Sequence, residues 1–511
     1  MNTLKKTVIT AMFFTLLSGA YAQMVGTPYI PPSDICTTNT EGTEFWVSFG
    51  RNYTNTADVV YLQLDIAAEA GTTVTLNFRA DNSSTTYTVA SATVLKIDLS
   101  NVQGSTPLGD KRAVVYLNPT GGAGLVGVSS NTLKITSSRP ISVYAFSACG
   151  DNNSVDATIV LPVNGWGTEY YRLSYAPNPT IILPRPQNSD VEIIIARENN
   201  TILTIPPTTT FTLAAGEAFY YYQNSEMIGR HITSNKPVAY FTHNTLSFVP
   251  FDRSAGDILF EQLQPVSRWG TKFLVPNAPQ GGNSLKNTIR IIAAENGTTV
   301  NYSGATVQTT YAYGGGPANP IPGAVNLPNG GTLNAGQFAE LSINSTGTGE
   351  NCYISASKPM AVAAYMVGIG DGGPSINSLG DPSIAWIPPL NQVVSSVTIA
   401  PFLFLPNSNP SSLDFFSAVH YMLIIAKTSN KAQTTVNGTP IGTAGWTDNT
   451  PSGFSYYLWT FATPQSATDL GDLDKIFTVA NPNGIIVLCG GLASGESYYY
   501  YAGGGLCGID P

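Results

Sequence analysis

The chain has 511 residues, of which 43% are apolar and only 11% are charged, and its formal net charge is −9. The high apolar content excludes a disordered chain, and the acidic balance excludes a basic nucleic-acid-binding protein. The 49 Gly and 35 Pro residues, with no sustained helical periodicity, predict an all-β chain rich in turns, with essentially no helix beyond an N-terminal signal.

The N-terminus is predicted to direct export. Lys5 and Lys6 precede a short apolar stretch at residues 8–17, and Ala20-Tyr21-Ala22 forms a small-x-small cleavage site. This order is typical of a secretory signal peptide, assigned to residues 1–22, although a buried N-terminal helix is the alternative. Residues 23–41 are then a linker. No later stretch has the 18 or more apolar residues of a transmembrane helix, so we expect an extracellular or cell-surface protein.

Three landmarks recur along the rest of the chain. A Gly-Thr-x-aromatic tetrapeptide occurs at residues 42–45, 167–170 and 270–273. Apolar runs followed by a turn end at Ala67, Ala196, Ala293 and Ala426. A proline introduces a further apolar segment at Pro140, Pro237, Pro359 and, in a degenerate form, Pro482. Because proline fixes its own backbone angle and lacks an N–H, we expect each of these prolines to be the first residue of a strand.

The landmarks keep their order while the spacing between them varies, which indicates a fixed strand framework with loops of different length. The sequence therefore predicts about four diverged repeats, each a β-sandwich-like unit, arranged in tandem. The predicted units are residues 42–165, 166–268, 269–390 and 391–511, the last including a C-terminal tail.

These landmarks resemble those of the N-terminal domain of the IgG Fc-binding protein family. The resemblance rests on residues 42–49, on Trp-Gly-Thr at Trp166 and Trp269, and on the repeated Lys/Arg-Pro dipeptides, and it covers roughly residues 42–500. It implies a secreted bacterial member of a family also found in animal mucus proteins, with a β-rich fold and an adhesion or matrix role. No Fc-contacting motif can be carried over to particular residues.

Five cysteines are compatible with an exported protein, and they allow at most two disulfides. Cys489 and Cys507 are the nearest pair in sequence and are predicted to form a terminal disulfide. Buried free thiols inside β cores are the alternative.

Catalytic constellations are missing from the sequence. The three histidines form no His-Glu-x-x-His pair, no Gly-x-Ser-x-Gly elbow joins a strand to a helix, and His243 and His420 are interpreted as structural. We therefore predict a protein that is not an enzyme and has no cofactor. Asp151, Asn153 and Asp156 are weak candidate ligands for calcium, which prefers oxygen-rich loops, but a solvated turn is the preferred interpretation.

Aromatic residues supply the candidate binding positions. Trp446 lies in a Thr- and Pro-rich stretch that we expect to be an exposed hairpin. Tyr498 and Tyr500 lie in a run of four tyrosines, and the outward-facing members of such a strand would offer contact area to a ligand.

The sequence thus favours a non-enzymatic adhesion or matrix protein that binds host or surface glycoproteins through the loops of its units, with an extracellular protein or glycan as partner and no nucleic acid. One alternative is a carbohydrate-binding or carbohydrate-processing accessory protein, which a cleft lined by aromatic side chains and two carboxylates would favour. The other is a subunit of an extracellular polymer, which an unpaired edge strand would favour.

Overall fold

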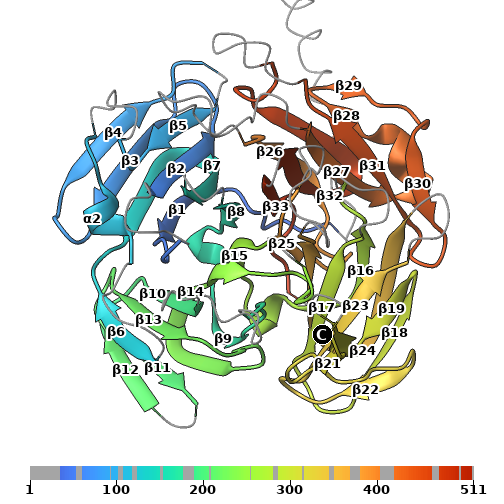
Figure 1. Cartoon of the computed structure of the whole chain (residues 1–511). Coiled ribbons are helices and arrows are strands. Elements are labelled where there is room, and N and C mark those ends of the chain that lie inside the picture. Colours follow the sequence, from blue (N-terminus) through green and yellow to red (C-terminus); the bar gives the residue numbers. More distant parts are fainter. Residues whose placement is uncertain are drawn as a thin grey trace, which may run out of the picture. The chain divides into compact units, whose positions relative to one another are not determined.

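Antiparallel β-sheets make up nearly all of the regular structure (Figure 1). The structure, a computed structural model, describes residues 35–508 except 53–59, 92–93, 102–107, 118–123, 150–153, 177–188, 207–208, 254, 280–285, 313–315, 345–349, 369–379, 403–418, 463–470 and 494–495. The predicted signal peptide lies outside these residues. No helix in the described ranges is long and apolar enough to span a membrane.

The first two sheets contain the strands up to Leu263. The first sheet has β1 (Gly42–Val47), β2 (Val60–Ala67), β3 (Thr73–Phe78), β4 (Ser84–Thr88), β5 (Leu95–Asp98), β7 (Leu133–Cys149) and β8 (Ser154–Val160). The second has β6 (Leu125–Ser129), β9 (Gly167–Tyr171), β10 (Asp190–Ala196), β11 (Thr201–Ile205), β12 (Thr209–Leu213), β13 (Ala218–Gln223), β14 (His231–Ser247) and β15 (Asp257–Leu263).

The next two sheets follow the same plan. The third has β16 (Gly270–Pro276), β17 (Thr288–Ala293), β18 (Thr298–Ser303), β19 (Ala305–Gln308), β22 (Gly331–Leu333), β23 (Phe338–Ile343), β24 (Asn351–Met366) and β25 (Ser383–Ile387), beside a small ribbon of β20 (Thr310–Tyr311) and β21 (Asn319–Pro320). The fourth has β26 (Val394–Ile399), β27 (Val419–Lys427), β28 (Thr435–Val436), β29 (Thr439–Pro440), β30 (Trp446–Asn449), β31 (Phe454–Thr460), β32 (Phe477–Ala493) and β33 (Glu496–Gly503).

Helical structure in the described ranges is limited to short turns. They are the α-helix α2 (Arg112–Val115) and the 3-10 helices η1 (Val163–Gly165), η2 (Val266–Arg268) and η5 (Thr428–Gln433). The predicted all-β class is confirmed.

One long strand organises each unit. In the first unit, the early half of β7 pairs with β1 and β3, and its later half pairs with β2 and β8. The strands β14, β24 and β32 divide their partners in the same way. Each unit is thus sandwich-like, with two ladders that share one strand, and the prediction of tandem sandwich-like units is confirmed.

The recurring prolines lie within these long strands and not at a strand start, so that expectation is wrong. Pro140 lies near the middle of the 17 residues of β7, where Thr136 is still paired with Glu44 and Ile141 is already paired with Gly42. The residues between them pass from one ladder to the other. A proline is tolerated at such a position because its missing N–H removes no ladder hydrogen bond.

The last strand of each unit lies innermost. β8 packs against β15 and β33, and β25 packs against the same two strands, so the four form a closed cycle (Figure 1). Their hydrogen-bonded partners are the long strands β7, β14, β24 and β32. We call β8, β15, β25 and β33 the central ring.

Apolar residues fill the space between neighbouring units. Along β10, Ile193 and Ile195 belong to the core shared with the first unit, while Ile194 belongs to the core on the opposite face. Strands buried on both faces have continuous apolar runs, which explains the Ile-Ile-Ile sequence. β6 precedes β7 in the chain but pairs with β13 in the second sheet, so one strand crosses from the first predicted unit to the second.

Candidate functional site

The two tyrosines predicted to bind a ligand are core residues, so their predicted outward orientation is wrong. Tyr498 and Tyr500 are 1% and 0% exposed in β33, all eight residues of which are buried. The Tyr498 hydroxyl lies 2.7 Å from Nδ1 of His420, and the Tyr500 hydroxyl donates to the carbonyl of Ala400 at 2.8 Å. Because β33 belongs to the central ring, units pack against both of its faces.

Trp446 lies at the outer edge of the fourth sheet and is half-buried. Its indole Nε1 donates to the carbonyl of Gly442 at 3.1 Å, and its ring centroid is 5.5 Å from that of Tyr457. Residues 442–445 beside it are exposed. The role of Trp446 in binding stays a prediction.

Of the three candidate calcium ligands, only Asp156 lies in the described part of the chain. Asp151 and Asn153 lie outside the described residues. Asp156 is fully buried in β8, and its carboxylate accepts backbone N–H groups of Phe260 at 2.9 Å and Ile384 at 3.4 Å. Asp156 therefore links three strands of the central ring. In the described part of the chain, no three His, Cys, Asp or Glu side chains are arranged to hold a metal ion.

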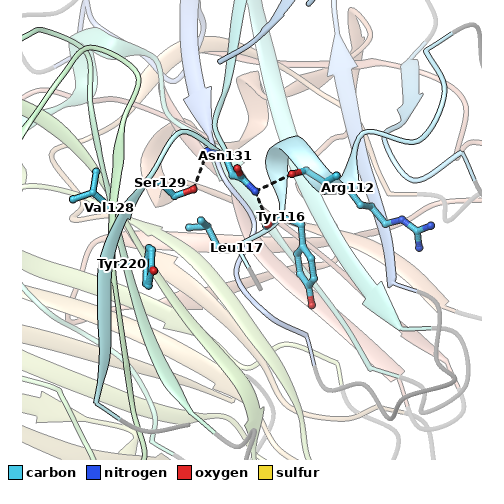
Figure 2. A pocket seen from close by; sticks show the side chains of 8 residues that line it. Arg112, Tyr116, Leu117, Val128, Ser129, Asn131 and Tyr220 are labelled. Carbon is cyan, nitrogen blue, oxygen red and sulfur yellow. Dashed lines mark hydrogen bonds between the residues drawn. The ribbon is translucent and has the colours of Figure 1, made fainter. Parts of the chain in front are cut away.

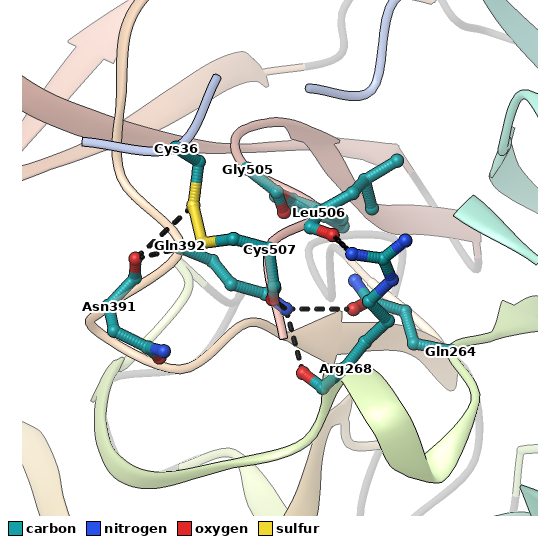
Figure 3. Close-up of a disulfide and its surroundings, with 9 residues drawn as sticks. Cys36, Gln264, Arg268, Asn391, Gln392, Gly505, Leu506 and Cys507 are labelled. Atoms are coloured by element: carbon teal, nitrogen blue, oxygen red, sulfur yellow. Dashed lines mark hydrogen bonds between the residues drawn. A yellow bond between two sulfur atoms is a disulfide. The ribbon is translucent and has the colours of Figure 1, made fainter. Parts of the chain in front are cut away.

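The disulfide joins the two ends of the described chain (Figure 3). Cys507 pairs with Cys36 across 471 residues, and Cys489 is a buried free thiol, so the predicted Cys489–Cys507 pair is wrong. The backbone N–H of Cys36 donates to Val393 at 2.9 Å, and the Gln392 side chain donates to the carbonyl of Cys507 at 3.1 Å. Sequence proximity favoured the wrong pair because the ring brings the chain ends together.

The histidines have environments of different kinds. His231 is exposed, with Nε2 2.8 Å from a carboxylate oxygen of Glu169. His243 is buried, and burial lowers its pKa to about 3, so it is neutral at physiological pH. Among the described residues, neither His231 nor His243 forms a hydrogen bond with a serine or cysteine that could act as a nucleophile.

A surface pocket of about 480 Å³ lies between α2 and β6 (Figure 2). Figure 2 shows Val128, Ser129 and Tyr220 on one side and Arg112 and Tyr116 on the other. Its lining residues are Arg112, Ala113, Tyr116, Leu117, Val128, Ser129, Asn131 and Tyr220. The Asn131 amide donates to the carbonyls of Ala113 and Tyr116, both at 3.0 Å, and so fixes α2 against the start of β7.

β6 offers a strand edge next to this pocket. It is the last strand in its sheet, so one edge has no strand partner among the described residues. Val126 and Val128 are 46% and 41% exposed, and only Ile202 and Leu458 are comparably exposed large apolar residues in the described ranges. Tyr220 packs on Gly127, where a Cβ would lie 2.5 Å from the tyrosine hydroxyl. This surface could not be predicted from the sequence, because β6 belongs to one predicted unit but pairs in the sheet of the next.

Comparison with known proteins supplies the family. A family profile described as IgGFc binding protein matches residues 156–479, which is more than half of the chain. The human IgGFc-binding protein is 22% identical over 489 residues, covering 93% of this chain but 8% of that protein, so the chain spans a small part of its relative. No solved structure matches the chain. Since the profile extends from the first strand of the central ring to β32, the chain belongs to the IgG Fc-binding protein family.

Proposed function

We propose that this protein is a non-enzymatic, exported adhesion or matrix module that binds an extracellular glycoprotein. Membership of the IgG Fc-binding protein family is the observation that carries the proposal. The Cys36–Cys507 disulfide is compatible with an oxidising extracellular environment.

The binding surface that we propose consists of β6 and the adjoining pocket. An exposed strand edge can pair with an extended segment of a partner through main-chain hydrogen bonds, while a neighbouring pocket takes its side chains. Val126 and Val128 would supply apolar contact, and Tyr116 and Arg112 belong to the residue types enriched at interfaces. The partner is therefore a protein segment in extended conformation.

The test is to measure binding of the mature protein to immobilised human IgG Fc and to a panel of purified extracellular glycoproteins. We expect saturable binding to at least one of them, weakened at least about tenfold by Val126→Lys combined with Val128→Lys, because lysine blocks apolar strand pairing. Ile202→Lys combined with Leu458→Lys is the matched control, since these residues are 41% and 43% exposed on other strands.

Equal binding by the β6 variant and the control would contradict the proposed surface, and no binding to any glycoprotein would contradict the proposed function. Loss of binding in Trp446→Ala alone, with free glycans competing, would favour the carbohydrate-binding alternative. Concentration-dependent assembly that β6 lysines abolish would favour the polymer alternative.

A further inference from the structure

Five buried acidic residues lie in the central ring or directly before one of its strands. Asp156, Asp257, Glu261, Asp381 and Glu496 are each at most 4% exposed. They come from all four units: four lie in β8, β15 or β33, and Asp381 lies two residues before β25. Because these strands form a closed cycle, the sequence gathers one acidic group or more from each unit at the centre.

Four of the five buried acids elsewhere in the described chain have basic partners. Asp190 pairs with Arg172, Glu340 with Arg290 and Asp65 with Lys96. In Glu192 the carboxylate lies 3.2 Å from Arg230. Asp98, the remaining one, accepts hydrogen bonds from the backbone N–H groups of Ser100 and Asn101 in a turn. Outside the central ring, each buried carboxylate is therefore stabilised by a basic side chain or by nearby hydrogen-bond donors.

The three acids Asp257, Asp381 and Glu496 differ in this respect: among the described residues, no ion pair joins any of them to a basic side chain. The acidic neighbours that raise the pKa of Asp257 are Glu496, Asp381 and Asp156. Glu261 faces Asp156 in the same way. Asp156, Asp257, Asp381 and Glu496 are thus acidic neighbours of one another, and Glu261 adjoins Asp156.

Hydrogen bonding leaves many of their oxygens without a partner. Oδ1 of Asp257 receives the Ser154 hydroxyl at 2.5 Å and the backbone N–H of Ile258 at 2.6 Å. Among the described residues, Oδ2 of Asp257, Oδ1 of Asp381 and both carboxyl oxygens of Glu496 have no hydrogen-bond partner. The hydroxyl of Ser383, the first residue of β25, is also fully buried and unpartnered.

Full ionisation of this group is physically excluded. An isolated buried carboxylate is strongly disfavoured, and neighbouring like charges raise the cost further. Burial raises the pKa of Asp257, Asp381 and Glu496 well above the usual range. Neighbouring carboxyl groups raise the pKa of Asp257 and Glu496 further. A metal ion is not favoured by the geometry, since no three acidic side chains in the described part are arranged to hold one.

We propose that Asp257, Asp381 and Glu496 form a proton-dependent lock, in which the central ring is closed while these carboxyl groups are protonated and is destabilised when they lose their protons. Ser154 and Ser497 supply neighbouring hydroxyl groups: the Ser154 hydroxyl donates to Asp257, and the Ser497 hydroxyl bonds to the backbone of Asp381. Closure of the ring is thereby coupled to the pH outside the cell.

The sign of the pH dependence follows from proton binding. An unfolded chain releases the protons of Asp and Glu near pH 4, whereas the folded ring retains them to higher pH. The contribution of each group to stability is complete below about pH 4 and is lost as the pH rises towards the folded-state pKa. The unfolding constant should increase about tenfold per pH unit for each carboxyl group that stays protonated in the folded protein.

The experiment is urea unfolding of the mature, disulfide-intact protein between pH 5.5 and 8.5. We expect the wild-type midpoint to fall as the pH rises. Asp257→Asn, Asp381→Asn and Glu496→Gln should each reduce the slope of the logarithm of the unfolding constant against pH by up to one. If one variant fails to fold, the other two variants and the pH dependence of the wild-type protein still test the proposal.

Asp81→Asn is the control. Burial raises the pKa of Asp81, but hydrogen bonds from Ser83 and Lys111 outweigh this effect and lower the pKa to about 2. This carboxylate is therefore ionised from pH 5.5 to 8.5, and its replacement should leave the dependence of the unfolding constant on pH unchanged. A flat or rising midpoint in the wild-type protein would overturn the proposal. So would a midpoint at pH 7.5 that calcium raises and chelation lowers, because cations would then close the ring.

Discussion

The glycine of each Gly-Thr-x-aromatic sequence lies against a proline that follows the innermost strand of the same unit. A Cβ added at Gly42, Gly167 or Gly270 would lie 2.4, 2.4 or 2.3 Å from the Cβ atom of its proline. The prolines are Pro162, Pro265 and Pro389. Such distances are far shorter than a van der Waals contact, so a side chain at these positions forces the backbone apart. The glycine of the Gly-Thr-x-aromatic landmark is therefore required where the first and last strands of a unit approach each other closely.

Gly167→Ala should destabilise the protein by about 1–3 kcal/mol, the usual range for overpacking a tight contact. The change is expected as a lower midpoint in chemical denaturation at fixed pH. Thr168→Ala is the control, because Thr168 is the next residue along the same strand and is exposed. Equal midpoints for the two variants would mean that the glycine is tolerant of a Cβ.

Residue types alone misled the prediction of binding residues. The tyrosine run at 498–501 has the composition of an interface, yet every member is at most 1% exposed. Asp156 belongs to an oxygen-rich stretch, yet its carboxylate bonds to backbone N–H groups of the central ring. Exposure depends on which strands close the ring, and no local pattern reports it.

At the scale of elements, polar contacts fix how neighbouring units meet. Arg290 of β17 is fully buried, and its guanidinium donates to Glu340 at 2.9 Å within its own sheet. It also donates to Glu226 at 2.7 Å and to the Ser174 carbonyl at 2.8 Å in the second unit, and it lies 3.6 Å from the ring centroid of Tyr175. One side chain thus joins the second and third units.

Arg290→Met should lower the free energy of unfolding by about 3–5 kcal/mol, because it leaves two carboxylates buried without a cation. The matched control is Arg197→Met. Arg197 also joins two units, through Glu44 at 2.9 Å, but its side chain is 46% exposed, so its loss should cost less than about 1 kcal/mol. Denaturant titrations of both variants measure the difference, and similar losses would argue against a special role for the buried arginine.

The long strands show what the pattern of elements could reveal. The sequence contained both the Gly-Thr and the proline landmarks. In the structure, the glycine of each Gly-Thr landmark pairs with the residue after a recurring proline. The pairs are Gly42 with Ile141, Gly167 with Val238 and Gly270 with Met360. The landmarks were therefore correctly recognised as framework. Their contact across about 70 to 100 residues could not be inferred, because a local pattern does not specify a strand partner.

At the scale of the whole unit formed by residues 35–511, the chain ends close the ring. Asn39 forms a bridge with Gly505, and the N–H of Leu506 donates to the carbonyl of Thr38 at 2.9 Å. The Cys36–Cys507 disulfide makes this contact covalent. The last unit is thereby attached to the segment that precedes the first.

Replacing both Cys36 and Cys507 by Ser should lower the free energy of unfolding by about 2–5 kcal/mol, because the unfolded chain is no longer constrained by a very long loop. Thermal and denaturant unfolding measure the loss. A reductant should lower the stability of the wild-type protein and leave the double variant unchanged. Unchanged stability in the double variant would show that the non-covalent contacts alone close the ring.

The sequence by itself determined the all-β class, the repetition and the resemblance to the family, because turn residues, period-two patterns and glycine or proline requirements are local. Only the tertiary structure decided the disulfide partners, the burial of Tyr498 and Tyr500, the crossing of β6 and the gathering of acids in the central ring. Each of these depends on which distant strands become neighbours when four units close on one another, and that closure follows from packing the apolar faces of whole sheets, which no single segment encodes.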